Sequence, residues 1–369
     1  MAKESSDVRK LADYIKSDRC KKIVLMLGAG ERKHFRRHSR LPFSRNRPIL
    51  LQANLARLKL PYPEAVFEIN FFRNNPVPFY TLAHELYPGK FRPTLTHSFI
   101  RLLAQRNLLH MCFTQNIDTL ERRAGVPDDK IIEAHGSFAT QRCIDCKRVY
   151  DDEKMKVKVL AKETPRCERA GCGGLIKPDI VFFGENLPDE FLRAIPMVAQ
   201  ADLLIVMGTS MTVHPFAGLA ERTGPNCPRV LVNLDRVGGI GRRPKDTVLL
   251  GKCDAIVLEL CQALGWEEEL NALWAKTEIK TTGEGEEEAD GEEAEAENLV
   301  ETITDAIERQ LNLGDGEAVA KKESEDDVPT ATTSTPAEPV AGGPATEKEE
   351  VEETQKEAPN VKDEKEPKL

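Results

Sequence analysis

The chain has 369 residues, and its 61 acidic and 52 basic side chains leave a formal net charge of −9 at pH 7. No stretch approaches the roughly 20 consecutive apolar residues of a membrane-spanning helix, which excludes an integral α-helical membrane protein. Nine cysteines and a polar N-terminus without a hydrophobic leader predict a soluble intracellular protein, with metal-bound thiols rather than disulfides.

The charge is divided unevenly along the chain. Residues 281–369 hold 28 acidic and 8 basic side chains, whereas residues 1–280 hold 33 acidic and 44 basic ones. The acidic part is rich in Glu, Ala, Thr and Pro and buries too little apolar surface to offset the entropy cost of ordering. We therefore expect a globular domain over residues 7–270 and a disordered acidic tail over residues 281–369.

The first predicted elements are a helix and a buried strand. Asp7 is expected to cap an amphipathic helix that directs Leu11 and Ile15 toward a core. The apolar run 23–27 then ends at Gly28, Ala29 and Gly30, as a parallel strand does where it turns to cradle the phosphates of a nucleotide. The same three residues are also compatible with an ordinary tight turn.

Further apolar runs end in polar or glycine residues, and a final strand closes the series. The runs are 109–113 before 114–118, 202–207 before 208–210 and 229–232 before 233–235, and the final strand is expected at 255–258. With helical stretches between them, these runs predict an α/β fold with a doubly wound, Rossmann-like parallel sheet. Its ligand site should lie at the carboxyl ends of the strands.

Four cysteines have the spacing of a zinc module. Cys143 and Cys146 form one close pair, and Cys167 and Cys172 form a second about twenty residues later. Paired thiols at this spacing predict a closed tetrahedral zinc site, which stabilises a fold and carries out no chemistry. The alternative is four buried free cysteines, but the interval between the pairs is polar and charged. His135, between small residues next to this module, is the better candidate for chemistry.

Two stretches do not fit the alternation of strands and helices, and we expect them to form a second, smaller domain, with the ligand cleft between the two domains. The small domain covers about 35–87 and 138–177 with the zinc module at 143–172, and the Rossmann-like parts cover about 20–34, 88–137 and 178–265.

These motifs together resemble the sirtuins, which are NAD-dependent protein lysine deacylases. Residues 53–67 are most similar to the cytoplasmic subgroup that acts on tubulin and histones, especially its fungal members. The matching segments follow the family's order across roughly residues 20–265: Gly28 to Gly30, Thr114 to Asp118, Glu133 to Gly136, the four cysteines, Lys177 to Glu185, Gly208 to Ser210, and Val232 with Asn233.

The resemblance implies a reaction. His135 would be the general base that takes a proton from the nicotinamide ribose, and an imidazole pKa of about 6.5 suits that work. Asn116 would order a water molecule and contact the ribose. The acetyl oxygen would displace nicotinamide, and the products would be nicotinamide, free lysine and 2′-O-acetyl-ADP-ribose. Taken alone, His135 could be a loop residue, and Asn116 and Asp118 could be ordinary turn formers.

The resemblance also implies the cofactors, NAD and one structural Zn²⁺, and the residues that contact NAD. Glycines and backbone N–H groups would approach the phosphates, where a side chain would obstruct them. Asp118 would hold the carboxamide of nicotinamide, Gln115 a ribose hydroxyl, and Cys253 would lie beside the adenine. The implied contacts are Gly28, Ala29, Gly30, Gln115, Asn116, Ile117, Asp118, Gly208, Thr209, Ser210, Asn233, Leu234, Asp235 and Cys253.

The implied partners are acetylated proteins such as histones and tubulin, with no membrane and no sequence-specific nucleic acid. The acyl-lysine would enter a tunnel, and the substrate backbone would pair with the enzyme as an added strand. The residues implied are Val181, Phe182, Phe183, Gly184 and Glu185, although Phe182 and Phe183 equally suit a core.

One segment departs from the family. Sirtuins continue after Gly-Ala-Gly with a segment containing Gly-Ile-Pro-Asp-Phe-Arg, whose Asp and Arg contact NAD and whose Phe shields the ribose. Residues 31–48 are instead strongly basic. Codons for residues 37–49 can be chosen so that a frame shifted by one base reads Gly-Ile-Pro-Asp-Phe-Arg-Ser-Pro-Gly-Thr-Gly-Leu. We hypothesise that residues 31–52 are frame-shifted; a genuine basic loop would instead weaken deacylation.

The tail contains one amphipathic stretch, residues 298–313, with its apolar residues on one helical face. A transient helix, a nuclear export signal at 303–313 read by an export receptor, and a helix that restrains the active site are all compatible with it. We expect a cytoplasmic protein that shuttles to the nucleus. Rival functions are a catalytically weak NAD-binding scaffold, a protein ADP-ribosyltransferase and a nucleic-acid-binding zinc ribbon.

Overall fold

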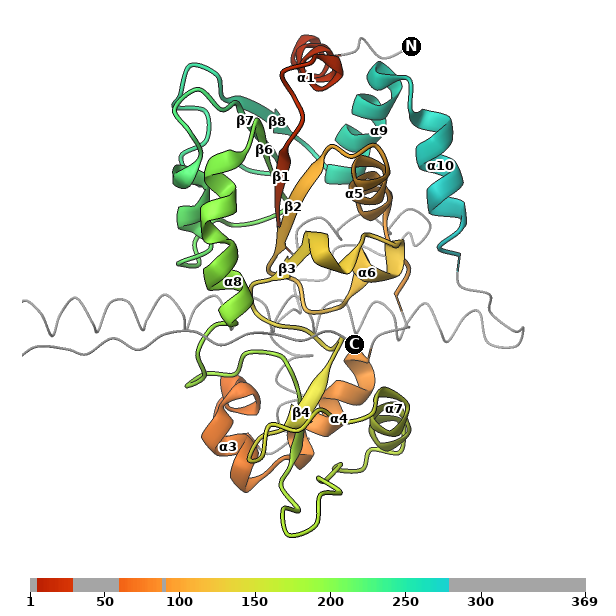
Figure 1. Cartoon of the computed structure of the whole chain (residues 1–369), viewed down its shortest axis with the longest axis vertical. Coiled ribbons are helices and arrows are strands. Elements are labelled where there is room, and N and C mark those ends of the chain that lie inside the picture. The colour runs from red at the N-terminus through yellow and green to blue at the C-terminus, as the bar shows by residue number, and fades with distance from the viewer. Residues whose placement is uncertain (1–4, 29–59, 88–90, 279–369) are drawn as a thin grey trace, which may run out of the picture. The chain divides into compact units, whose positions relative to one another are not determined.

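The computed structural model describes residues 5–28, 60–87 and 91–278 (Figure 1). The acidic tail, the stretch 298–313 that was expected to form a helix, the segment 31–52, and Ala29 and Gly30 therefore lie outside the described residues. The helices are α1 (Ser6–Lys16), η2 (Pro63–Phe67), α3 (Ile69–Asn74), α4 (Val77–Leu86), α5 (Leu95–Gln105), α6 (Leu120–Ala124), η3 (Asp128–Lys130), α7 (Asp152–Leu160), α8 (Asp189–Ala194), η4 (Ile195–Gln200), η5 (Ala217–Arg222), α9 (Cys253–Leu264) and α10 (Glu267–Ala275).

Six strands form one parallel sheet in the order β3-β2-β1-β6-β7-β8. The order reverses between β1 and β6, so the predicted doubly wound sheet is confirmed. The six strands are β1 (Ile23–Leu27), β2 (Leu109–Thr114), β3 (Ile131–Glu133), β6 (Leu203–Met207), β7 (Arg229–Asn233) and β8 (Thr247–Leu250).

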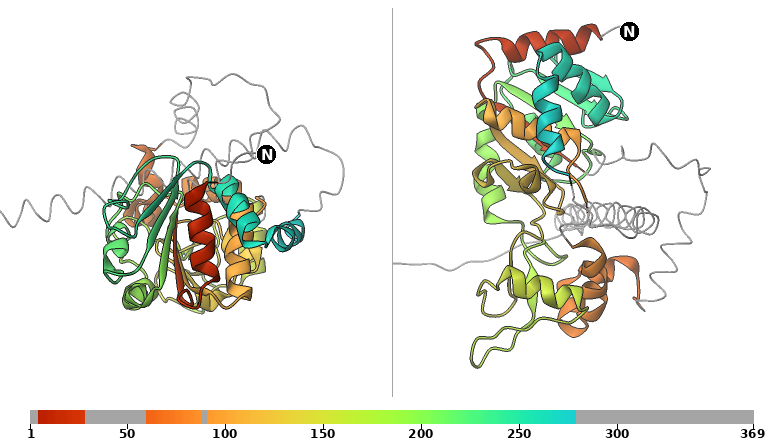
Figure 2. Two further views of the ribbon diagram at one scale, coloured as in Figure 1. Left: turned by 90° about the horizontal axis from the view of Figure 1, so that it is seen from above. Right: turned by 90° about the vertical axis from the view of Figure 1, so that its right-hand side faces the viewer.

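Alternating side chains of β1 enter two different cores. Ile23, Leu25 and Leu27 pack in a cluster with residues of α1, α5, α9 and α10, whereas Val24 and Met26 pack with residues of α8, η4 and η5. Figure 2 shows the two groups of helices on opposite faces of the sheet. Because both faces are covered, each strand of the centre reads as a continuous apolar run in the sequence.

A third core joins two separate stretches of the chain. The two-stranded antiparallel sheet of β4 (Gln141–Cys143) and β5 (Ile176–Pro178) packs with residues of η2, α3, α4 and α7. Four phenylalanines at its centre, Phe67, Phe72, Phe79 and Phe182, have ring centroids 5.1 to 6.1 Å apart in mostly edge-to-face pairs. We call residues 60–87 and 138–178 the small lobe. The predicted domain boundaries stay a prediction.

The expected final strand at 255–258 is wrong. These residues lie within α9, where Cys253, Ile256, Val257, Leu260, Cys261 and Leu264 are buried at helical spacing, and the last strand is β8. A short apolar run does not distinguish a strand from a buried helix, and here the apolar pattern extends for three turns. The expected cap of α1 is also wrong, because Ser5 is the N-cap residue and Asp7 lies in the first turn. Leu11 and Ile15 are buried as predicted.

No helix within the described residues is both long enough and apolar enough to cross a membrane.

Candidate functional site

The carboxyl ends of four neighbouring strands, β2, β1, β6 and β7, lie side by side. Backbone N–H groups continue the hydrogen-bond ladder beyond the strands: Gln115 donates to Leu27 O at 3.0 Å, and Gly208 donates to Val232 O at 3.1 Å. Gly28 donates to Met207 O at 3.2 Å. The glycine and polar residues that the sequence placed after β1, β2 and β6 therefore meet at one edge of the sheet, as predicted.

Side-chain hydrogen bonds connect this edge across the sheet. Thr209 Oγ1 donates to Gln115 Oε1 at 2.8 Å, and Asn233 Nδ2 donates to Thr209 O at 3.3 Å and to Asp235 O at 2.9 Å. Gln115, Thr209 and Asn233 are all buried. The network holds residues that follow β2, β6 and β7 in fixed positions relative to one another, which prepares the edge to bind a ligand.

Gly28 is required by the close approach of two chain segments. A Cβ at this position would lie 2.8 Å from Thr209 Cβ and 3.0 Å from Gly208 O, which is too close for a side chain. Gly208 itself has a φ of +60°, a conformation that favours glycine. The glycines at this edge thus serve packing between strands, in addition to any approach by a phosphate.

His135 follows β3 and is buried, with 3% of its surface exposed. Burial lowers the pKa of His135 to about 4, against an opposing hydrogen bond with the Gln115 backbone. Because charging the imidazole in this site is unfavourable, the ring is neutral at pH 7 and has a nitrogen able to accept a proton. Its contact with Gln115 places it at the edge described above.

Asn116, Ile117 and Asp118 continue from Gln115 and are buried. Asn116 N donates to Thr114 Oγ1 at 3.1 Å, and Leu120 N donates to Asp118 Oδ1 at 3.0 Å, so Asp118 satisfies a backbone N–H at the start of α6. These local bonds are turn chemistry; they hold the Asn116 backbone against Thr114 and orient the Asp118 side chain.

The remaining described residues that we expect to contact NAD differ in their exposure. Ser210 is exposed and shares a hydrogen bond of 2.8 Å with Thr212, and the Leu234 side chain is 46% exposed. Cys253 is buried at the start of α9, where its thiol donates to Val232 O at 3.6 Å. Asp235 is exposed.

The segment from Lys177 to Glu185 is bonded directly to the His135 loop. Val181 N donates to His135 O at 2.9 Å. A Cβ on Gly136, whose φ is +66°, would lie 1.8 Å from Asp179 O, so the two segments touch along their backbones. Phe182 lies in the core of the small lobe, Gly184 has a φ of +87°, and Val181 and Phe183 are partly buried. The predicted catalytic and substrate-binding residues are therefore adjacent.

The four cysteines form one cluster. All four Sγ atoms lie within 4.8 Å of one another, and the pairs Cys143–Cys172 and Cys146–Cys167 are 3.6 Å apart. A disulfide needs about 2.05 Å between sulfurs, whereas neighbouring thiolates on a tetrahedral zinc with bonds of about 2.3 Å lie about 3.8 Å apart. The donor set therefore fits zinc, as the spacing predicted.

The surroundings of the cluster also fit a metal-bound set of thiolates. Backbone N–H groups of Arg148, Arg169 and Gly174 donate to the sulfurs of Cys146, Cys167 and Cys172. Such bonds orient metal ligands and stabilise their negative charge. A Cβ on Gly174 would lie 2.8 Å from Cys143 Sγ, so a larger residue would crowd the site.

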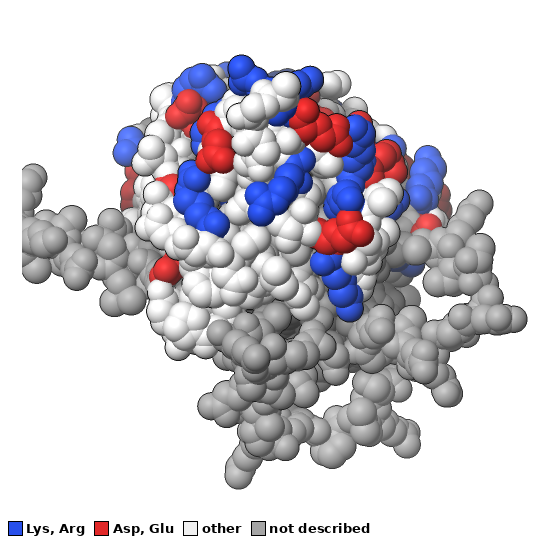
Figure 3. Space-filling model, turned by 90° about the horizontal axis from the view of Figure 1, so that it is seen from below, with Lys and Arg blue, Asp and Glu red and all other residues white. Residues whose placement is uncertain are grey.

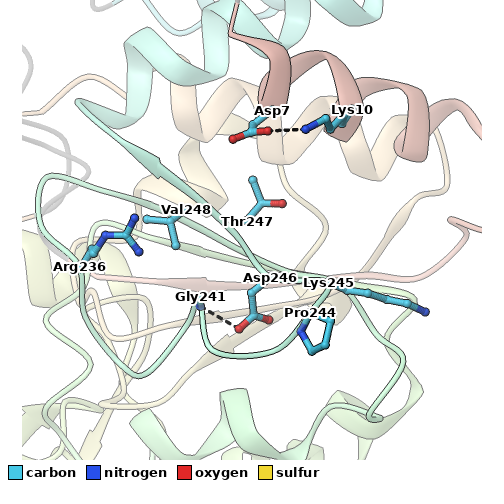
Figure 4. Close-up of a pocket in the computed structure, with 9 residues that line it drawn as sticks. All are labelled: Asp7, Lys10, Arg236, Gly241, Pro244, Lys245, Asp246, Thr247 and Val248. Atoms are coloured by element: carbon cyan, nitrogen blue, oxygen red, sulfur yellow. Dashed lines mark hydrogen bonds and ion pairs between the residues drawn. The ribbon is translucent and has the colours of Figure 1, made fainter.

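An open pocket of about 420 Å³ lies apart from these residues (Figure 4). It is lined by the start of β8, by the loop before it and by Asp7 and Lys10 of α1. Because Thr247 and Val248 begin β8, this pocket is at the amino ends of the strands, opposite the predicted site. Both acidic side chains of the pocket have partners in Figure 4: Asp7 forms an ion pair with Lys10, and Asp246 accepts a hydrogen bond from Gly241 N.

Charges of both signs are interspersed over the face seen from below, next to a wide uncharged area (Figure 3). Among the described residues on this face, acidic side chains interrupt the basic ones, unlike the continuous basic surface that nucleic-acid binding uses.

Sequence reasoning missed the role of Lys177, which is 6% exposed and paired with Glu185 at 2.9 Å. Its position directly after the apolar pair Leu175 and Ile176 was the available signal, since lysine is seldom buried without a partner.

Comparison with known proteins shows similarity to one family. A model of the Sir2 family matches residues 45–215. The chain is 46% identical over 314 residues to NAD-dependent protein deacetylase hst2-1 of Emericella nidulans, covering 85% of each protein. It is 47% identical over 281 residues to NAD-dependent protein deacetylase hst2 of Schizosaccharomyces pombe, covering 76% of this chain and 82% of that protein. It is 40% identical over 320 residues to NAD-dependent protein deacetylase sirtuin-2 of Danio rerio, covering 79% and 83%.

Proposed function

Because the chain belongs to the Sir2 family, we propose that it is an NAD-dependent protein lysine deacetylase. The observation that carries this proposal is the position of His135. Its neutral ring contacts the Gln115 backbone at the edge of the sheet, and its carbonyl accepts from Val181 in the predicted substrate segment. One residue thus connects the two sites that a deacetylase must bring together.

The residues at the edge of the sheet fit a dinucleotide. Gly28, Gly208 and Thr209 lie at the carboxyl ends of β1 and β6, where a doubly wound sheet binds a dinucleotide, and Gln115, Asn116 and Asp118 would hold the ribose and nicotinamide. Bound NAD supplies the ADP-ribosyl group that accepts the acetyl group. The further NAD contacts that we propose are Ala29, Gly30, Ile117, Ser210, Asn233, Leu234, Asp235 and Cys253.

His135 would act as the general base. Burial gives His135 a pKa of about 4, below the 6.5 expected from the sequence, so its neutral imidazole can take a proton from a ribose hydroxyl but is a weaker base than a free histidine. Asn116, whose backbone N–H donates to Thr114 Oγ1, would position a water molecule and the ribose.

The substrate is an acetylated protein. The segment Val181, Phe182, Phe183, Gly184 and Glu185 would accept the acetyl-lysine and pair with the backbone of the substrate as an added strand. Histones and tubulin are the substrates that we propose, together with a cytoplasmic location, shuttling to the nucleus and recognition of residues 303–313 by an export receptor. One structural Zn²⁺ held by the four cysteines would stabilise the small lobe.

The test is to detect acetyl-ADP-ribose by mass spectrometry after incubation with NAD and an acetyl-lysine peptide. The full chain should be compared with a version in which the shifted frame at residues 31–52 is restored. We expect the product from the restored version and much less from the chain as written. ADP-ribosylated protein without acetyl-ADP-ribose would indicate a transferase, and NAD binding without either product would indicate a scaffold.

A further inference from the structure

Lys177 of β5 is a buried lysine whose ammonium group has three partners. Its Nζ donates to Pro178 O at 3.1 Å and to Ile180 O at 2.6 Å, and pairs with Glu185 Oε2 at 2.9 Å. These use all three N–H bonds of the ammonium. Nζ also lies 4.4 Å from the centre of the Phe182 ring. A buried charge persists only when its partners replace water, so this arrangement strongly fixes the backbone that follows Lys177.

The carboxylate of Glu185 is turned back toward its own segment. Its Oε2 accepts from Phe182 N at 2.9 Å in addition to Lys177, and Glu185 N donates to Phe182 O at 2.9 Å. Gly184, with a φ of +87°, allows the chain to turn between these bonds. Lys177 and Glu185 therefore hold the two ends of the segment 177–185 together.

The segment is also bonded to its surroundings on two sides. Val181 N donates to His135 O at 2.9 Å, and Phe183 N donates to Phe67 O at 2.8 Å. Ile69 N donates back to Phe183 O at 3.2 Å. A change in the course of residues 178–185 would therefore reach the His135 loop directly.

We propose that Lys177 and Glu185 are positioning residues that hold residues 178–185 in the conformation that binds an acetyl-lysine peptide. The inference rests on the proposed function and narrows it: the Glu185 carboxylate serves Lys177 and the Phe182 amide, and backbone groups of the segment meet the peptide. The pair acts through the segment and does not touch the reacting atoms.

Fluorescence anisotropy with a labelled acetyl-lysine peptide tests the pair in the full chain. The variants are Lys177→Met, Glu185→Gln and the double variant, and the matched control is Lys154→Met, which removes an exposed pair with Glu168 in the small lobe. We expect each single variant to raise the Kd of the peptide about tenfold, because each loses a charge-assisted bond. The double variant should have a Kd no higher than that of the single variant that binds the peptide less tightly, since the two residues act as a unit.

Steady-state kinetics of the frame-restored protein separate positioning from loss of folded protein. Positioning predicts a higher KM for the peptide with the KM for NAD changed less than about twofold; a reduced folded fraction lowers kcat at unchanged KM. If Lys177→Met does not fold, Glu185→Gln, which keeps the shape of the side chain, decides. If Glu185→Gln folds and has the wild-type Kd and KM for the peptide, the role of Lys177 and Glu185 is overturned, whereas the proposed function is not. Wild-type protein that binds the acetylated peptide no better than an unacetylated one overturns the proposed function as well.

Discussion

The six-stranded sheet and the small lobe are stabilised in different ways. All five residues of β1 are buried between two apolar clusters, so the sheet depends on burial of apolar surface on both faces. β4 and β5 have three residues each, and a two-stranded sheet of this size is not stable alone. The small lobe depends on its four thiols and its phenylalanine cluster. The catalytic candidate, His135, therefore lies where a part stabilised by its apolar core meets a part stabilised by its metal site.

The largest expected effect is the unfolding of the zinc-binding part of the small lobe without unfolding of the sheet. Cys143→Ser should abolish zinc binding and unfold residues 138–178 while the sheet stays folded, because the metal supplies the folding free energy of such modules, about 10–16 kcal/mol in isolated peptides. Metal analysis and hydrogen exchange measure both effects.

The control for this variant is Cys227→Ser, which changes another buried cysteine outside the cluster and should leave zinc bound. A Cys143→Ser protein without metal but with residues 138–178 still protected from exchange would refute the structural zinc site.

The next largest effect concerns His135, where the six-stranded sheet meets the small lobe. His135→Ala in the frame-restored protein should reduce turnover by about 10²–10⁴-fold, the range for loss of a general base. Folding and zinc content should be retained, because the imidazole is neutral and its removal leaves no buried charge. Measurement of acetyl-ADP-ribose formation tests this, and turnover close to wild type would remove His135 from the role of base.

A smaller effect is expected from the ion pair between Asp246, just before β8, and Arg229 of β7. Asp246 pairs with the buried Arg229 at 2.7 Å and accepts from Gly241 N at 2.8 Å. Burial alone would raise the pKa of Asp246, but these donors lower it to about 2. Asp246→Asn should cost about 1.5–3 kcal/mol of unfolding free energy at pH 7, because the buried Arg229 loses its carboxylate partner and keeps only the ion pair with the exposed Glu221.

The pH dependence of this cost has a definite sign. The carboxyl of Asp246 has a lower pKa in the folded protein than in the unfolded chain, so its stabilisation is present above about pH 4 and is lost as the pH falls toward 2. Urea unfolding at pH 7 and pH 3 should show the difference between wild type and Asp246→Asn shrinking at pH 3. A difference independent of pH would contradict this account.

The smallest effect is expected on the surface of the small lobe. Lys154 and Glu168 form a pair at 2.6 Å, but both side chains are more than half exposed. Exposed pairs are screened by water and salt. Lys154→Met should leave thermal unfolding and peptide binding unchanged within error, and a clear loss of either would show that the lobe depends on surface charge.

The sequence predicted what local patterns encode. The strand at residues 23–27 has the predicted limits, because a strand covered on both faces is a continuous apolar run. The zinc ligands were found because two close cysteine pairs are a local signal. The helical character of 255–258 was missed because four apolar residues suit either element. The pair of Lys177 and Glu185 was missed because it forms only after β5 and the following turn have folded together.

The most direct test of the account is the titration of His135 by NMR in the ligand-free protein, with His135→Ala to assign its signals. Burial at the junction predicts a neutral imidazole with a pKa of about 4, compared with 6.5 for an exposed histidine. The folded state should then lose stability as the pH falls from about 6.5 toward 4, because the unfolded chain binds the proton first. A midpoint near 4 would support a buried base between the two parts of the molecule. A midpoint at 6.5 or above would show that burial does not lower the pKa of His135 and would contradict the central claim.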